Sequence, residues 1–260
     1  MTWVIGSPSM WGYGLAISDI RVSFPDGSTA DCLQKVYGVG RFIAAGFAGS
    51  VEFGFRALSD LSAELAQIPQ GEGWIPGWVA FKWYRRVRRG FAAAPDSVRR
   101  LGSEIVLIGV SPTVDLGIPG FARPTVAILR APNFEPQILR MNAIESIGSG
   151  RGVEPYREEL ERLGRDRQVQ LSEAGMPGGF GGMLMHFLRG TLEEHPDRFV
   201  SPYVHLCLVR RGEISIQKSD YTIFEGGEPR EIRMPPVATS WDEFQDRCQH
   251  LGADAGAAIC

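Results

Sequence analysis

The second residue of this chain is a threonine, Thr2, which directly follows Met1. Removal of Met1 would leave a hydroxyl group and a free α-amine on one residue, so the nucleophile would carry its own general base. An unperturbed α-amino group titrates near pH ~7.7–8, close to the pH at which such a base must work. Thr2 is therefore a candidate N-terminal nucleophile for amide cleavage.

Such a nucleophile needs three more groups, and the first fifty residues contain a candidate for each. A cation near the hydroxyl favours the charged intermediate, an acid holds the cation in place, and backbone N–H groups face the developing oxyanion. Asp19 lies on the first predicted strand pair, Lys35 lies on the second, and Gly49 lies where a strand runs into a helix. At the start of a helix the backbone N–H groups point outward without partners, which makes the Gly49 N–H available. The side chains of Asp19 and Lys35 and this N–H can therefore converge on Thr2.

Each of these residues also has a purely structural explanation. Lys35 can be a solvated strand residue, and Asp19 with Arg21 can form a turn ion pair worth ~0–1 kcal/mol. Gly46 and Gly49 can serve only to let a sheet and a helix pack closely. The catalytic interpretation therefore depends on the whole set of residues and not on any one of them.

Four short segments carry this set at defined separations: residues 14–21 (GLAISDIR), Lys35-Val36, residues 46–49 (GFAG) and residues 147–150 (IGSG). Lys35 follows Asp19 by sixteen positions, and Gly49 follows Lys35 by fourteen. In these features the chain resembles the proteasome β-subunits and their bacterial relative HslV, which are N-terminal-nucleophile (Ntn) hydrolases. The resemblance is strong over residues 2–50 and weaker over residues 147–209.

The resemblance implies a role for each matching residue. Thr2 would be nucleophile and base, Lys35 its electrostatic partner, Asp19 the residue that orients the lysine, and the Gly49 N–H the oxyanion donor. Ser149 would support the amine, and Ser201 matches the serine of a late acid-serine motif. A pocket for large apolar side chains would be lined by Val22, Leu33, Tyr37, Phe47 and Val51.

The expected fold is α+β, a four-layer αββα sandwich of two antiparallel sheets flanked by helices. Residues 1–235 would form this proteasome-like domain, and residues 236–260 a short C-terminal helix and tail. The expected activity is that of a threonine peptidase acting on peptides or unfolded proteins, in a homo-oligomeric ring that an ATP-dependent unfoldase could feed. The alternative is a catalytically inactive, proteasome-like scaffold or interaction subunit.

Hydrophobic periodicity and turn residues predict the elements that would position these groups. A hairpin is expected around residues 6–9, a turn at residues 25–27, and a capping box at residues 240–243 that begins a short helix. Residues 252–260 are small, and we expect them to be frayed. The further expected strands are 33–39, 41–47, 104–110, 125–130, 137–147, 204–209 and 213–224, and the helices are 50–67, 77–93, 154–168 and 183–194, with a glycine-rich break at 175–182.

Composition excludes several other classes of function. The formal net charge of −3 argues against a general nucleic-acid binder, and the basic segment 82–89 is expected to be the solvated face of a helix. The four cysteines lack CxxC spacing, so neither a disulfide framework nor a zinc site is expected, and no cofactor is implied. With no signal peptide and no ~20-residue apolar run, the chain is expected to be cytoplasmic and away from membranes.

Overall fold

The computed structural model describes residues 2–68, 76–115, 122–165, 179–217, 220–225 and 228–260. The fold is α+β, with helices and antiparallel sheets. No helix among the described residues is long and apolar enough to cross a membrane.

One five-stranded sheet carries the N-terminal segment and has the strand order β10-β1-β2-β11-β12. Its strands are β1 (Val4–Ser9), β2 (Tyr13–Asp19), β10 (Glu145–Ile147), β11 (Val204–Arg210) and β12 (Glu213–Gln217). Thr2 therefore lies just before β1, next to the end of β2, because Val4 pairs with Ser18 in this register.

The other five-stranded sheet has the order β5-β6-β7-β8-β9. Its strands are β5 (Val36–Gly40), β6 (Ile43–Gly49), β7 (Ser103–Asp115), β8 (Ala122–Arg130) and β9 (Gln137–Ile138). Two short hairpins complete the strands: β3 (Arg21–Ser23) with β4 (Thr29–Asp31), and β13 (Tyr221–Glu225) with β14 (Glu228–Ile232).

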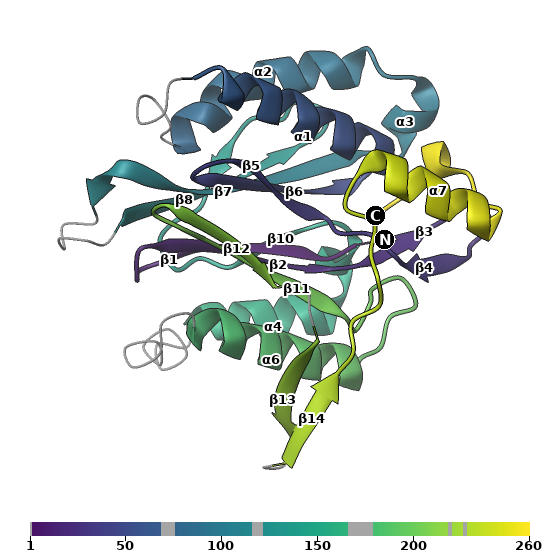
Figure 1. Ribbon diagram of the computed structural model, residues 1–260. Helices are drawn as coiled ribbons and strands as arrows, with labels where there is room; N and C mark the ends of the chain where they lie inside the picture. The colour runs from purple at the N-terminus through teal and green to yellow at the C-terminus, as the bar shows by residue number, and fades with distance from the viewer. Residues whose placement is uncertain (1, 69–75, 116–121, 166–178, 218–219, 226–227) are drawn as a thin grey trace.

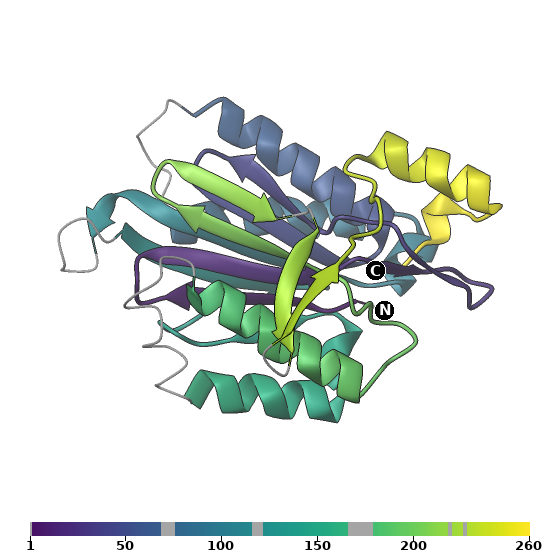
Figure 2. The ribbon, with the colours of Figure 1, turned by 60° about the horizontal axis from the view of Figure 1, so that its bottom comes forward.

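The two large sheets lie face to face, and helices cover their outer sides (Figure 1). Helices α1 (Val51–Ala66) and α2 (Pro76–Ala92) lie beside the second sheet, and α4 (Glu154–Arg165) and α6 (Gly179–Glu194) lie beside the first. The shorter helices are α3 (Asp96–Arg100), α7 (Trp241–Leu251) and the 3₁₀ turns η1 (Ser149–Gly152) and η3 (Ala255–Ala257). Figure 2 shows the segment after α7 turning back toward the sheets.

Strand periodicity explains why β2 is buried on both faces. Ala16 faces the core between the sheets, whereas Leu15 and Ile17 belong to a second core that they share with α4 and α6. Gly14 lets the sheets approach closely, since a Cβ there would lie 2.5 Å from the Ile108 side chain. Small residues on the inner face thus set the spacing of the two sheets.

The helix predicted for residues 50–67 is confirmed, with Ser50 as its N-cap accepting from the Phe53 N–H at 3.3 Å. The turn at residues 25–27 and the helix beginning after Ser240 are confirmed too. The Ser240 hydroxyl accepts from the Glu243 N–H, as the capping box predicts. The Glu243 carboxylate, however, binds the Thr239 N–H and hydroxyl and completes the cap one residue earlier.

The predicted hairpin forms between β1 and β2, but its turn is not at residues 6–9, because β1 continues through Pro8 and the chain turns at residues 10–12. The Pro8 carbonyl accepts from the Asn142 N–H, so the proline nitrogen also faces away from β2. On that side β10 pairs only with Val4, Ile5 and Gly6, and no ladder hydrogen bond is lost at Pro8.

Two predicted strands are each broken into parts. Residues 137–147 divide into β9 and β10, which belong to different sheets, and Asn142 between them has a positive φ of 61°. Residues 213–224 divide into β12 and β13. Of the predicted glycine-rich break, residues 175–178 lie outside the described residues, and residues 179–182 are the first turn of α6.

The C-terminal residues are not frayed, which corrects the expectation for residues 252–260. Ala258 and Cys260 are buried, and the backbone of this segment is hydrogen-bonded to Ser23, Gly49 and Val51. Small side chains led to the wrong prediction, because side-chain size does not report the main-chain hydrogen bonds that hold this segment.

Candidate active site

Thr2, Asp19 and Lys35 meet in one buried cluster, as their separations predict. The Lys35 Nζ lies 2.7 Å from Asp19 Oδ1 and also donates to Thr2 Oγ1. The Thr2 hydroxyl donates to Asp19 Oδ1 at 3.1 Å. Thr2 and Lys35 are 0 % exposed and Asp19 is 1 % exposed. The hydroxyl oxygen thus lies against an ammonium group in a site that excludes water, where a cation stabilises developing negative charge most strongly.

The Asp19 carboxylate is held by backbone donors as well as by Lys35. Its Oδ1 accepts from the Trp3 N–H at 2.8 Å, and its Oδ2 accepts from the N–H groups of Arg21 at 3.1 Å and Ser201 at 3.2 Å. A buried ion pair is tolerated when its remaining hydrogen-bonding capacity is filled in this way. The structural alternative of a solvated Lys35 is therefore wrong.

Arg21 is a supporting residue whose partner was not predicted from the sequence. Its guanidinium pairs with Asp31, at 2.7 Å and 2.9 Å, and not with Asp19. Its Nη1 also donates to the carbonyls of Arg198 and Val200, which holds the segment ending at Ser201 against the site. The hydrogen bond to Asp31 raises the pKa of Arg21 above its ordinary value. The signal was present, because these two residues lie five positions on either side of Asp26 and pair across the β3–β4 hairpin.

Ser149 and Ser201 both reach the cluster, in different ways. The Thr2 nitrogen donates to Ser149 Oγ at 3.0 Å, which places that hydroxyl where the resemblance expects support for the amine. Ser201 binds Asp19 through its backbone N–H, while its hydroxyl accepts from the Tyr203 N–H at 3.1 Å. Ser201 thus positions the carboxylate with its main chain.

Gly148 shapes the turn that brings Ser149 to Thr2. Its φ is +85°, and a Cβ at this position would overlap the Thr2 carbonyl oxygen. The same turn returns a hydrogen bond to Thr2, from the Gly150 N–H to the Thr2 carbonyl at 3.0 Å. Only glycine allows this close approach.

Gly148→Ala is expected to destabilise the protein more than Gly212→Ala, a matched control. Gly212 has a similar φ of +89°, but nothing lies within 4 Å of the position that a Cβ would take there. The free energy of unfolding of the control should fall by about 1–2 kcal/mol, the cost of placing a residue with a Cβ in the left-handed backbone region. Gly148→Ala adds a steric clash at Thr2 to that cost. Urea unfolding of both variants measures the difference. Equal losses would show that the turn at Gly148 is not tightly packed on Thr2.

Gly49 ends β6, two residues after Phe47, whose N–H donates to the Lys35 carbonyl at 3.2 Å. Gly49 has a φ of +92°, and a Cβ there would lie 2.5 Å from the Gly102 carbonyl oxygen. The predicted oxyanion donor, the Gly49 N–H, donates to the carbonyl oxygen of Cys260 at 2.5 Å. This N–H therefore donates to a main-chain oxygen that the chain's own C-terminal segment supplies.

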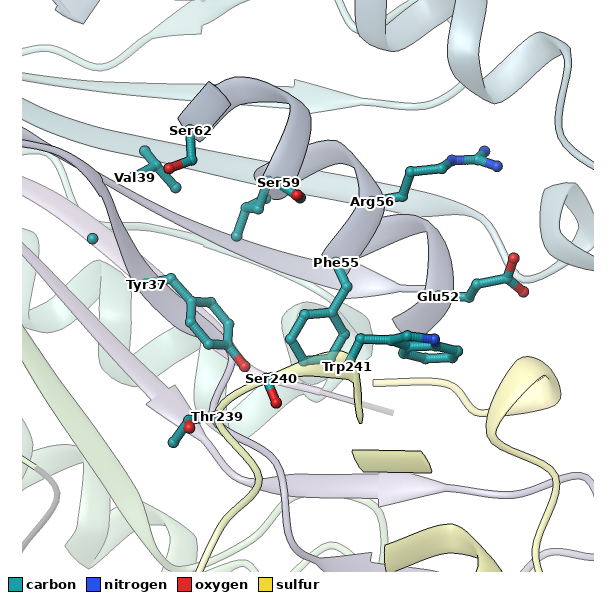
Figure 3. Close-up of a pocket in the computed structure, with 12 residues that line it drawn as sticks. Tyr37, Val39, Glu52, Phe55, Arg56, Ser59, Ser62, Thr239, Ser240 and Trp241 are labelled. Atoms are coloured by element: carbon teal, nitrogen blue, oxygen red, sulfur yellow. The ribbon is translucent and has the colours of Figure 1, made fainter. Parts of the chain in front are cut away.

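The five predicted pocket residues divide into two groups. Val22, Leu33, Phe47 and Val51 are 0 % exposed and belong to the larger core. Tyr37 is half-buried and lines a cavity of about 530 Å³ between β5, α1 and the start of α7 (Figure 3). The rings of Phe55 and Trp241 line the same cavity, whose walls include none of Thr2, Asp19 and Lys35. The substrate pocket stays a prediction.

Within the described part of the chain, no three His, Cys, Asp or Glu side chains are grouped so that they could hold a metal ion. The four cysteines are free, and burial raises the pKa of Cys207 to about 12. No protein-family model matches the sequence, and a search of curated proteins finds no match.

Proposed function

We propose that the chain is an N-terminal threonine amide hydrolase of the proteasome β-subunit and HslV type. The observation that carries this proposal is the buried contact of the Thr2 hydroxyl with Lys35 and Asp19, with Ser149 at the Thr2 nitrogen. The arrangement of two sheets between two helix pairs supports a four-layer Ntn sandwich. A lysine that only extends from a strand into solvent would not be buried against a threonine hydroxyl and a carboxylate.

The proposed reaction begins once Met1 has been removed and Thr2 carries a free α-amine. The amine takes the proton of the Thr2 hydroxyl, and Oγ1 attacks the carbonyl carbon of a substrate amide. Lys35 stabilises the negative charge that develops on Oγ1, Asp19 keeps Lys35 in place, and Ser149 orients the amine. The Gly49 N–H donates to the oxyanion of the tetrahedral intermediate.

The intermediate collapses when the amine of Thr2 returns its proton to the leaving nitrogen and the carbon–nitrogen bond breaks. The acyl group remains on Thr2 as an ester, and the free amine then activates a water molecule that hydrolyses it. The amine therefore acts as base and acid in turn. Peptides or unfolded chains are the proposed substrates, while ring assembly and an ATP-dependent unfoldase are implied by the resemblance and stay predictions.

One observation favours the alternative, a catalytically inactive scaffold. The Gly49 N–H is already bonded to the main-chain oxygen of Cys260, so the chain itself occupies the predicted oxyanion donor. A scaffold would keep this contact permanently. An enzyme must release it before a substrate carbonyl can bind.

Single-turnover hydrolysis of an unstructured polypeptide separates the two functions. With the full chain in excess over substrate, the enzyme is expected to generate new N-termini, which mass spectrometry detects. A threonine-reactive β-lactone should abolish this cleavage. A preparation that lacks Met1 and still cleaves nothing would support the scaffold.

A further inference from the structure

The last three residues of the sequence form an added strand between the ends of β3 and β6. The Ser23 N–H donates to the Ile259 carbonyl at 2.8 Å, and the Ile259 N–H donates to the Ser23 carbonyl at 3.0 Å. On the other side, the Cys260 N–H donates to the Gly49 carbonyl at 2.9 Å, and the Gly49 N–H donates to the Cys260 carbonyl. Residues 258–260 are therefore paired through their main chain on both edges.

The side chains of this strand follow the alternation of an extended peptide. Ala258 and Cys260 are buried, and Ile259 is half-buried. The Cys260 sulfur lies 3.6 Å from the Gly49 carbonyl oxygen and 3.9 Å from that of Phe47. Burial raises the pKa of the Cys260 thiol to about 12, while Lys35 acts to lower it and Asp19 to raise it. The charges of Lys35 and Asp19, the two ionic groups of the candidate active site, therefore both act on the Cys260 thiol.

The segment before this strand has its own contacts with the rest of the fold. Helix α7 packs Phe244 and Cys248 into the core, and Ala238 forms a bridge with Leu33. Asp254 caps η3 by accepting from the Gly256 N–H at 2.9 Å. These contacts anchor α7 and η3 through groups other than those of residues 258–260.

We propose that residues 258–260 occupy the main-chain hydrogen-bonding groups of Ser23 and Gly49 that would otherwise bind the backbone of an extended substrate, and thereby inhibit the site until they are displaced. This inference rests on the proposed function. The pairing itself supports it, because a main-chain oxygen of Cys260 accepts from the Gly49 N–H, the predicted oxyanion donor, and main-chain hydrogen bonds continue to Ile259 on the Ser23 side. Strand addition of this kind recognises a backbone without requiring one particular sequence.

Because the inhibiting strand belongs to the same chain, a substrate must compete with it at a high effective concentration. The apparent affinity for substrate is then reduced to the fraction of molecules in which residues 258–260 are displaced. Releasing the strand should therefore raise kcat/KM and leave the chemistry at Thr2 unchanged.

Two variants and one control test this inference. The first variant ends the chain at Ala257, and the second, Ile259→Pro, removes the N–H that donates to Ser23. The control, Ile259→Ala, keeps that N–H. With thermal melting confirming that each variant is folded, we expect kcat/KM to rise about tenfold in both variants if roughly one molecule in ten is open in the parent chain. The control should stay within twofold.

Two readouts do not depend on turnover. Alkylation of Cys260, mapped by mass spectrometry, should become faster in Ile259→Pro, while Cys207, buried in β11, stays protected as an internal control. A fluorescent peptide with the sequence of residues 255–260 should bind the shortened chain and not the full chain. The same peptide with proline in place of Ile259 should bind more weakly.

The outcomes distinguish this inference from the proposed function. Turnover by the full chain that neither variant increases, with no peptide binding, would overturn the inhibitory strand and leave the hydrolase intact. No turnover in any variant would overturn the hydrolase and, with it, the inhibitory role of residues 258–260.

Discussion

Thr2→Ala is expected to reduce kcat/KM for amide hydrolysis by about 10⁴-fold or more, the scale seen when a nucleophile is removed. The substitution deletes the hydroxyl that contacts Lys35 and Asp19. The Lys35–Asp19 ion pair does not depend on that hydroxyl, so the loss of stability should be about 1 kcal/mol. Peptide turnover and urea unfolding measure the two effects on the same samples.

Thr2→Ser is the matched control, because it keeps a hydroxyl and an amine on one residue. It should retain activity within about two orders of magnitude of the parent chain, as its nucleophile and base are unchanged. Activity of Thr2→Ala close to that of the parent would place the nucleophile elsewhere. Loss of activity in both variants would show that the methyl group of Thr2 is needed to position its hydroxyl.

Breaking the buried ion pair is expected to produce the largest change in stability. Asp19→Asn should lower the free energy of unfolding by about 3–5 kcal/mol, since it leaves the Lys35 ammonium buried without a counter-ion. Lys35→Met should cost less, because Asp19 keeps the backbone N–H groups of Trp3, Arg21 and Ser201. Both variants should lose hydrolysis, and urea unfolding ranks their stabilities.

The double variant Asp19→Asn/Lys35→Met measures the coupling between the two charges. The double variant should lose less free energy of unfolding than the two single variants together, by about 1–3 kcal/mol, because no unpaired charge remains. Arg86→Met is the exposed control: Arg86 lies 3.3 Å from Glu64, with side chains that are 54 % and 40 % exposed. That variant should change stability by less than about 1 kcal/mol. Strict additivity of Asp19 and Lys35 would contradict their direct contact.

The sequence predicted the cluster because its members lie on neighbouring elements at short separations. Asp19 ends a strand that pairs with the segment after Thr2, and Lys35 directly precedes the strand that pairs with β6. The helix after Ser50 was predictable from its cap and its apolar spacing. Local patterns of this kind survive in the fold because packing and propensity favour the same structure.

The rest of the site depends on contacts between distant segments, which periodicity does not report. Ser201 approaches Asp19 through a backbone N–H, a group that every residue except proline carries. The contact of Cys260 with Gly49 joins the last residue of the sequence to the end of β6 through a pair of main-chain hydrogen bonds, which side-chain patterns do not report. The hairpin turn predicted at residues 6–9 lies instead at residues 10–12, because the sequence does not show which side of β1 is paired at Pro8.

The most direct test of the central claim is the intact mass of the purified protein before and after treatment with a β-lactone. If Thr2 is the nucleophile, the mass should be lower than that of the 260-residue sequence by one methionine, and fragmentation should place a single adduct on Thr2. A protein that retains Met1 and acquires no adduct at Thr2 would contradict this claim.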